Sequence, residues 1–224
     1  MGISPRIITL TDASGAFWAA GQGMLVVVVD VIDMSTTLEA ALEAGASMVL
    51  GASPDFSSAP VTLDPYRIGL YGAEQAAMFS TSVVVISEPR VGSEADRSAR
   101  CQKLLAGIKA GNGQMDGIFP NLGAETPRLI ELKNKVVIAA TDTGGVAFDA
   151  AFQVAPTRVT VGTIARTLGK RGRQPVEACL ERVRQMVIET SAAGIAVVAA
   201  SRNSLEDVLA SNYIATQFMM GFTN

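Results

Sequence analysis

The feature that most constrains this chain is a set of short runs built from valine, isoleucine and other apolar residues. The clearest is LVVVVD at 25–30, where four consecutive valines precede Asp30. A strand with one face in water alternates apolar and polar residues, whereas several of these runs are apolar throughout, which is typical of strands covered by helices on both faces. The runs predict strands at 25–30, 46–51, 66–71, 82–87, 115–119, 135–140, 157–161 and 195–200.

Helical patterns lie between the predicted strands, and they predict helices at 36–44, 93–110, 145–154, 175–193 and 204–220. Alternation of strands and helices favours the α/β class, with three layers (α/β/α) around a mostly parallel or mixed sheet. The 224 residues suit one compact unit, 1–224, or two lobes that share a core and meet near 115–125.

Composition limits the classes of protein to consider. Hydrophobic residues make up 49% of the chain and charged residues 17%, yet no apolar run approaches the ~20 residues of a membrane span. The N-terminus does not resemble a signal peptide. With a net charge of −3 and no basic surface to hold a phosphate backbone, we expect no nucleic acid partner and no membrane partner. Cys101 and Cys179 fall in helical patterns, and free thiols there fit a cytoplasmic protein.

The absence of histidine narrows the chemistry further. It excludes a Ser-His-Asp triad, an imidazole base and a histidine-ligated zinc. Acid–base or metal chemistry must therefore come from carboxylates, Lys, Tyr, Cys or water.

Polar residues directly follow four of the predicted strands. Because the carboxyl ends of parallel strands meet at one edge of a sheet, we expect these residues to surround a common crevice. Helices that begin there favour anions, and carboxylates there suit Mg²⁺. The four groups are Asp30, Asp33, Ser35, Thr36 and Thr37; Gly72 and Glu74; Thr141, Asp142, Thr143, Gly144 and Gly145; and Ser201, Arg202, Asn203, Glu206 and Asp207.

A purely structural interpretation exists for most of these residues. Thr36 and Glu39 have the spacing of a capping box, as do Asn203 with Glu206 and Ser204 with Asp207. Asp142 could serve only as a turn residue within TDTGG. Asp30 is harder to explain in this way, because a carboxylate that ends a run of valines is expected to be partly buried and then needs a partner or a metal.

At this point the chain resembles a known family, the 2-phosphosulfolactate phosphatases, also called ComB-like proteins. The family has a D-V-L-R-A-S-T-T type motif after its first strand, and VVDVIDMSTTLEAALEAGA at 28–46 is similar to it. In order along the chain, FPNLGAETP at 119–127, VVIAATDTGGVA at 136–147, VGTIA at 161–165 and NSLEDVLASNYIA at 203–215 resemble later family segments. Residues 75–115 match poorly.

The resemblance implies an α/β fold and a Mg²⁺-dependent hydrolase that removes phosphate from a small sulfonated acid. Three family arginines are replaced here, by Asp33, Gln75 and Val146, and the family asparagine before the last of them is Asp142. A strongly anionic substrate needs fixed positive charge, which arginine supplies well. We therefore expect a changed substrate, a less anionic or differently shaped phosphoester.

The leading hypothesis is thus a Mg²⁺-dependent phosphatase-like hydrolase with a small anionic substrate. The candidate residues are Asp30, Asp142 and Glu74 for catalysis; Ser35, Thr36, Thr37, Thr143, Gly144 and Asn121 for substrate; and Asp30, Glu206 and Asp207 for the metal. The alternative is a non-catalytic protein that keeps the ComB-like fold for ligand binding or assembly. In the C-terminal helix, Ile214, Phe218 and Met219 are expected to face the core, and a homodimer contact there is the other option.

Overall fold

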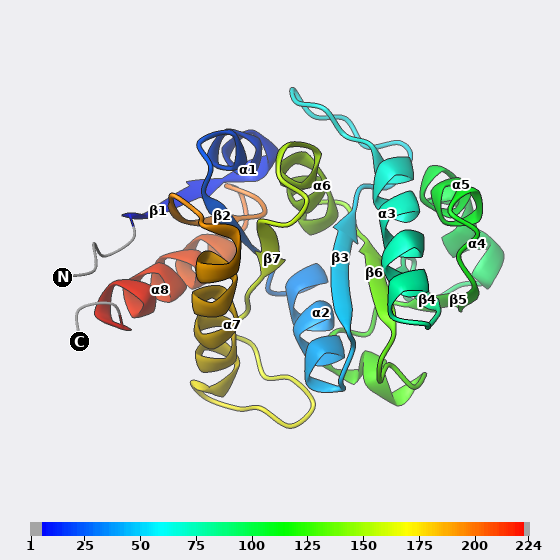
Figure 1. The fold of residues 1–224 in the computed structure, drawn as a ribbon. Coiled ribbons are helices and arrows are strands. Elements are labelled where there is room, and N and C mark those ends of the chain that lie inside the picture. The colour runs from blue at the N-terminus through cyan, green and yellow to red at the C-terminus, as the bar shows by residue number, and fades with distance from the viewer. Residues whose placement is uncertain (1–5, 222–224) are drawn as a thin grey trace.

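The computed structural model describes residues 6–221, which form parallel strands joined by helices (Figure 1). The strands are β1 (Arg6–Thr11), β2 (Leu25–Val29), β3 (Met48–Ala52), β4 (Val83–Ser87), β5 (Met115–Pro120), β6 (Val136–Ala140), β7 (Val159–Val161) and β8 (Gly194–Ala199). The helices are α1 (Asp12–Gly21), α2 (Met34–Glu43), α3 (Pro65–Met78), α4 (Glu94–Ala99), α5 (Gln102–Ala110), α6 (Gly144–Val154), α7 (Gln174–Thr190) and α8 (Leu205–Gly221), with a 3₁₀ helix, η1, at Gly123–Arg128.

The strands form two sheets of four. The first has the order β1-β8-β2-β7 and the second the order β3-β6-β4-β5, and every strand pair in both is parallel. The chain passes from the first sheet to the second in residues 30–47, through α2, and returns in residues 141–158, through α6. Residues of β7 and β3, one edge strand from each sheet, line a common cavity, so the two sheets lie next to each other at these strands. β5, which contains residues 115–120, lies at the outer edge of the second sheet.

Helices cover both faces of the sheets, which gives the expected three-layer α/β/α architecture. α1, α6 and α3 lie on one face, whereas α8, α7 and α2 lie on the other. Along β2, Val26 and Val28 pack toward the α1 and α6 side, and Leu25, Val27 and Val29 pack toward α7 and α8. All five residues of β2 are buried, which is why this strand has no polar alternation.

One predicted strand is wrong: residues 66–71 belong to helix α3. The Asp64 carboxylate caps this helix by accepting a hydrogen bond from the Arg67 N–H at 3.2 Å, and Pro65 occupies its first turn. The apolar residues that suggested a strand are buried at helical spacing, with Ile68, Gly72 and Ala76 on the inner face. The Asp-Pro start signal outweighs the apolar run.

Three further elements were not predicted: β1, α1 and η1. β1 is an edge strand, and its residues are exposed or only partly buried, so its sequence lacks the continuous apolar pattern of the buried strands. The predicted helix at 93–110 is divided into α4 and α5 at Arg100 and Cys101. In α8, Ile214 and Phe218 are fully buried as expected, whereas Met219 is 48% exposed.

No helix among residues 6–221 is long and apolar enough to cross a membrane. Cys101 and Cys179 are both buried free thiols. Burial raises the pKa of Cys101 to about 11 and that of Cys179 to about 12, so neither is a reactive thiolate at neutral pH.

Candidate functional site

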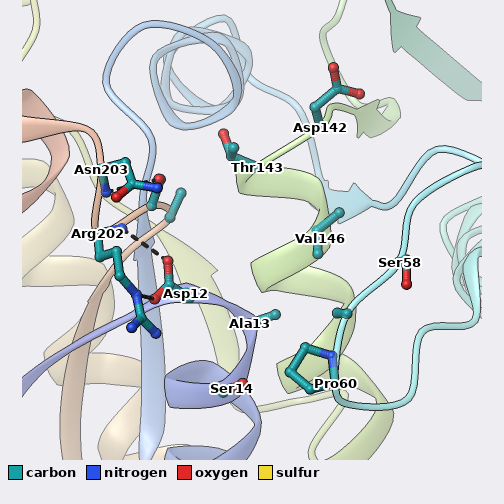
Figure 2. Close-up of a pocket in the computed structure, with 13 residues that line it drawn as sticks. Asp12, Ala13, Ser14, Ser58, Pro60, Asp142, Thr143, Val146, Arg202 and Asn203 are labelled. Atoms are coloured by element: carbon teal, nitrogen blue, oxygen red, sulfur yellow. Dashed lines mark hydrogen bonds and ion pairs between the residues drawn. The ribbon is translucent and has the colours of Figure 1, made fainter.

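Two adjoining pockets open at the carboxyl ends of the strands. The first, which we call the acid pocket, has a volume of about 320 Å³ and is lined by Asp30, Ile32, Asp33, Thr143, Ser201, Asn203, Ser204, Glu206 and Asp207. The second, which we call the hydroxyl pocket, has a volume of about 280 Å³ and is lined by Asp12, Ala13, Ser14, Ser58, Ala59, Pro60, Asp142, Thr143, Val146, Ala200, Ser201, Arg202 and Asn203 (Figure 2). They share Thr143, Ser201 and Asn203.

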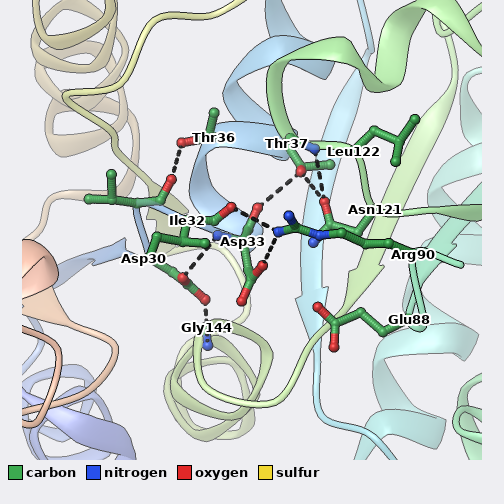
Figure 3. A network of polar contacts seen from close by, with 12 residues as sticks. Asp30, Ile32, Asp33, Thr36, Thr37, Glu88, Arg90, Asn121, Leu122 and Gly144 are labelled. Carbon is green, nitrogen blue, oxygen red and sulfur yellow. Dashed lines mark hydrogen bonds and ion pairs between the residues drawn. The ribbon is translucent and has the colours of Figure 1, made fainter.

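Asp30 forms the floor of the acid pocket, where it links the end of β2 to the start of α6. The residue is 3% exposed. Its Oδ2 accepts hydrogen bonds from the Gly144 N–H at 2.9 Å and the Thr143 hydroxyl at 3.3 Å, and its Oδ1 accepts one from the Asp33 N–H at 3.3 Å (Figure 3). Asp30 therefore occupies the favourable anion position at the N-terminus of α6.

The environment of Asp30 opposes its ionisation. Burial is the main cause, followed by the charges of Asp207 and Asp33, and together they raise the pKa of Asp30 from 3.8 to about 6, although hydrogen bonds from the Asp33 and Met34 N–H groups act in the opposite direction. A carboxyl group with such a pKa, in a pocket, is typical of a functional site.

Glycine at position 144 is what allows Asp30 to approach α6 this closely. A Cβ atom at Gly144 would lie 2.2 Å from Asp30 Oδ2 and 2.8 Å from Met34 Cβ. Any larger residue would separate the strand end from the helix and break the hydrogen bond to the Gly144 N–H. The Gly144 N–H, which was predicted to bind a substrate anion, thus binds a carboxylate of the protein itself.

The three hydroxyls at the start of α2 are buried and bonded inside the protein. Ser35 accepts from the Asp30 N–H at 2.9 Å and donates to the Val28 carbonyl, also at 2.9 Å. Thr36 bonds to the Val31 carbonyl and to Thr163, and Thr37 donates to the Asp33 carbonyl and to Asn121. None of the three lines either pocket, so they shape the loop instead of meeting a ligand there.

Asn121 follows β5 and is completely buried. Its Oδ1 accepts hydrogen bonds from the Thr37 hydroxyl and from the Gly123 N–H at 3.2 Å, which fixes the orientation of the amide (Figure 3). Its Nδ2 has no partner among the described residues, and it lines neither pocket. The predicted substrate contact is therefore replaced by a role in joining β5 to α2.

The start of α8 supplies the other acids of the acid pocket. The Ser204 hydroxyl accepts from the Asp207 N–H at 3.2 Å, so the predicted cap at these two residues is confirmed. The Asp207 carboxylate accepts from the Val31 N–H at 2.8 Å, and burial is the main reason that its pKa is raised, with the charges of Glu206 and Asp33 adding to this. Glu206 is exposed at the mouth of the pocket.

The predicted metal ligands line one pocket, but they do not form a ready-made three-carboxylate site. Within residues 6–221, no group of three or more His, Cys, Asp or Glu side chains is arranged to hold a metal ion. Mg²⁺ commonly takes only one or two carboxylates and completes its shell with water and substrate phosphate. The four acids of the acid pocket, with no basic residue in its lining, fit that mode of binding.

Arginines that sequence reasoning missed lie beside the site. Arg90 pairs with Asp33 at 2.5 Å, and Arg100 pairs with Asp142 at 2.6 Å and lies 3.9 Å from Glu88. Both arginines come from residues 75–115, outside the segments that suggested the site from sequence. They form ion pairs with two acids at this edge, Asp33 and Asp142.

Glu88 and Arg90 follow strand β4 directly, so the same search for polar residues at strand ends could have found them. Burial is the main reason that the pKa of Glu88 is raised, and the charges of Asp33 and Asp142 add to it. Asp12, which follows the unpredicted strand β1, is also at this edge. It pairs with Arg202, accepting from its backbone N–H at 2.9 Å and from its guanidinium.

Two predicted roles are overturned by the structure. Glu74 does not follow a strand; it lies on the exposed face of α3 and lines neither pocket at the carboxyl edge. Thr36 and Glu39 do not form a capping box, because α2 already begins at Met34 and the Glu39 carboxylate forms an ion pair with Arg182.

Asp30 and Asp142, which the sequence predicted to share one crevice, lie in adjoining pockets at the same edge. Thr143 connects them, since it follows Asp142 in the chain, donates to Asp30 and lines both pockets. In comparisons with known proteins, no family model matches the chain, and no curated protein matches it.

Proposed function

We propose that this protein is a Mg²⁺-dependent phosphatase-like hydrolase of a small phosphoester. The observation that carries the proposal is the acid pocket, in which Asp30, Asp33, Glu206 and Asp207 converge from two strand ends beside the hydroxyls of Thr143 and Ser201. The resemblance to 2-phosphosulfolactate phosphatases supports the same reaction class. Buried free thiols support a cytoplasmic location.

In this proposal Asp30 and Asp207 would hold Mg²⁺, which neutralises phosphate charge and orients the phosphate when it is bound. Burial and the charges of Asp207 and Asp33 together raise the pKa of Asp30, and a cation bound beside it would oppose both effects. Ser201, which lines both pockets, would donate a hydrogen bond from its hydroxyl to a phosphate oxygen. The hydroxyl of Thr143 donates to Asp30 and so helps to position that carboxylate.

The reaction breaks one P–O bond and forms another. Water attacks phosphorus, the bond from phosphorus to the alcohol oxygen breaks, and the alcohol and inorganic phosphate are released. Glu206, exposed at the pocket mouth, would accept the proton that the attacking water loses, and the alcohol oxygen takes a proton from solvent. Asp142, held by Arg100, would accept a hydrogen bond from the departing alcohol.

A panel of phosphomonoesters assayed with Mg²⁺ and with EDTA tests this proposal. We expect phosphate release that EDTA abolishes, and a loss of about 100-fold or more in kcat/KM in Glu206→Gln. Asp30→Asn should remove the response to Mg²⁺. Glu181→Gln, which changes an 80% exposed acid on α7, is the matched control and should keep wild-type turnover. Phosphate release that is unaffected by EDTA would contradict the proposal.

A second candidate is a non-catalytic protein that binds a ligand at the same edge or serves in assembly. The observation that favours it is that Arg90, Arg100 and Arg202 are each already paired with a carboxylate, so none is held free for phosphate. Absence of turnover across the panel, together with a ligand-induced rise in Tm, would favour this candidate.

A homodimer would use exposed residues of α8 such as Leu205, Leu209 and Tyr213, which light scattering can test.

A further inference from the structure

The hydroxyl pocket is the second cavity at the carboxyl edge, and nothing above assigns it a ligand. It adjoins the acid pocket through Thr143, Ser201 and Asn203, so a molecule whose phosphate occupies the acid pocket would extend into it. Its volume of about 280 Å³ is close to the lower limit of small-molecule pockets, about 300 Å³. This suits a compact ligand.

We propose that the hydroxyl pocket binds a neutral polyhydroxylated alcohol, so that the substrate is the monophosphate of a small polyol or sugar. This inference rests on the proposed phosphatase function. The alcohol that leaves in that reaction is inferred from the charge and the hydrogen-bonding groups of the pocket lining.

The charge of the lining argues against a second acidic group on the ligand. Arg202, the only basic residue in the lining, already pairs with Asp12 at 2.5 Å. Asp142 on the opposite side pairs with Arg100 at 2.6 Å. A carboxylate or sulfonate entering the pocket would meet the like charges of Asp12 and Asp142 without gaining an unpaired cation, which is unfavourable.

The hydrogen-bonding groups of the lining instead match alcohol groups. Ser14 and Ser58 contribute hydroxyls and Asn203 an amide, and each of these groups can both donate and accept. The carboxylates of Asp12 and Asp142 can accept hydrogen bonds from ligand hydroxyls while they keep their arginine partners, because each carboxylate has about four acceptor positions.

The wall that carries Ser58 is anchored at both ends. The carboxylate of Asp149, a fully buried residue of α6, accepts from the Ser53 hydroxyl and from the Asp64 N–H at 2.9 Å. Asp55 accepts from the Gln102 N–H at 2.7 Å at the start of α5. Segment 53–64 is therefore tied to two helices on either side of Ser58.

A matched pair of substrates tests the inference: glycerol 2-phosphate and 2-phosphoglycerate, in which a carboxylate replaces one hydroxymethyl group. With Mg²⁺ present, we expect kcat/KM to be at least about 10-fold higher for glycerol 2-phosphate, since the carboxylate of 2-phosphoglycerate would lie beside Asp12 and Asp142 without an unpaired cation. Longer polyol phosphates, such as ribitol 5-phosphate, should also be hydrolysed.

Val146→Arg, which adds a cation to the apolar wall of the hydroxyl pocket, should reverse this preference. Val154→Arg is the matched control: it lies on the same helix, is 37% exposed and is outside the pocket lining, so the preference should persist. Saturable binding of ribitol, measured by ligand-observed NMR, gives a second readout. This binding should be lost in Val146→Arg and kept in Val154→Arg.

The outcomes separate this inference from the proposed function. Hydrolysis of 2-phosphoglycerate in preference to glycerol 2-phosphate would overturn the polyol assignment and leave the phosphatase proposal standing. Ribitol binding that Val146→Arg abolishes, without turnover of any ester, would support the pocket assignment and contradict the phosphatase proposal. If ribitol does not bind and no polyol phosphate is hydrolysed, the inference is overturned.

Discussion

At the scale of single residues, Asp30 is the side chain whose protonation matters most. It lies at the end of the valine run, and its folded-state pKa of about 6 exceeds the ordinary value of 3.8, chiefly because of burial and then because of the charges of Asp207 and Asp33. Between these two values the folded protein binds more protons than the unfolded chain. The contribution of Asp30 to the free energy of unfolding is therefore lowest when its carboxyl is ionised.

The first prediction follows from the difference between the folded-state and ordinary pKa values of Asp30, which corresponds to about 3 kcal/mol when the carboxyl is fully ionised. From pH 4.5 to 7.5, we expect the Asp30 contribution to the free energy of unfolding to fall by about 2 kcal/mol. Urea unfolding of wild type and Asp30→Asn in EDTA measures it, because the variant lacks this titration whereas all other groups titrate in both. Parallel pH profiles would show that the pKa of Asp30 is not raised.

The same residues show what sequence can and cannot reveal about a site. The burial of Asp30 and its need for partners could be predicted, because a carboxylate that ends a buried strand has few other options. The partners of Ser35 and Thr37 could not, because a hydroxyl in the first turn of a helix bonds equally well to a ligand, to water or to a nearby carbonyl. Their commitment to Val28 and Asn121 depends on three-dimensional contacts.

At the scale of elements, α3 and α5 pack with their backbones in close contact. A Cβ atom at Gly69 would lie 2.1 Å from the Leu104 carbonyl oxygen, and one at Gly107 would lie 2.0 Å from the Tyr66 carbonyl oxygen. These two glycines therefore determine how closely the helices approach, and side chains cannot rotate to relieve such a contact with backbone atoms.

The second prediction concerns these glycines. Gly107→Ala should lower the free energy of unfolding by about 1–3 kcal/mol, despite the better helix propensity of alanine, because the helices must separate. Gly21→Ala at the end of α1 is the control: nothing lies within 4 Å of its Cβ position, so it should be neutral or slightly stabilising. Equal effects of the two substitutions in urea denaturation would contradict the close packing of α3 and α5.

Buried central strands could be predicted well from the sequence, whereas the edge strand β1 and the start of helix α3 could not. β2, β4, β6 and β8 have apolar residues on both faces, so their runs are unmistakable. β1 lies at an edge and lacks that pattern. The run at 66–71 was wrongly predicted as a strand because apolar content alone does not distinguish a short strand from the buried face of a helix.

At the scale of the whole molecule, the sequence indicated three layers but not their division into two sheets. The pairing of Arg90 with Asp33 and of Arg100 with Asp142 depends on the position of β4 beside β6, which hydrophobic patterns do not encode. A gap between the edge strands β7 and β3 holds a third cavity of about 360 Å³, lined in part by Met48, Val159 and Arg182. Contacts across this gap must join the two halves.

The ion pair between Glu39 and Arg182 is such a contact, because it joins α2, which packs on the second sheet, to α7, which packs on the first. The Glu39 side chain is 4% exposed and that of Arg182 is 22% exposed. The Arg182 guanidinium also donates to the Thr160 hydroxyl at 3.2 Å and to the Val161 carbonyl at 2.8 Å, at the edge of β7.

Arg182→Met should therefore lower the free energy of unfolding by about 3–5 kcal/mol, because it leaves the Glu39 carboxylate buried without its partner. The double variant Glu39→Leu/Arg182→Met should recover much of that loss, since no unpaired charge remains. Arg173→Met at the N-cap of the same helix, which removes an exposed pair with Glu177 at 3.8 Å and a hydrogen bond to Gln217, is the control and should cost about 1 kcal/mol or less.

Urea denaturation followed by both circular dichroism and the fluorescence of Trp18, the single tryptophan, can show whether the halves unfold together. Trp18 lies on α1 and reports on the first sheet, whereas circular dichroism reports on all helices and strands. In wild type the two transitions should coincide, and in Arg182→Met they should separate if this ion pair couples the sheets. A variant as stable as the Arg173→Met control, with coincident transitions, would show that the apolar core around α6 joins the two halves without help from this pair.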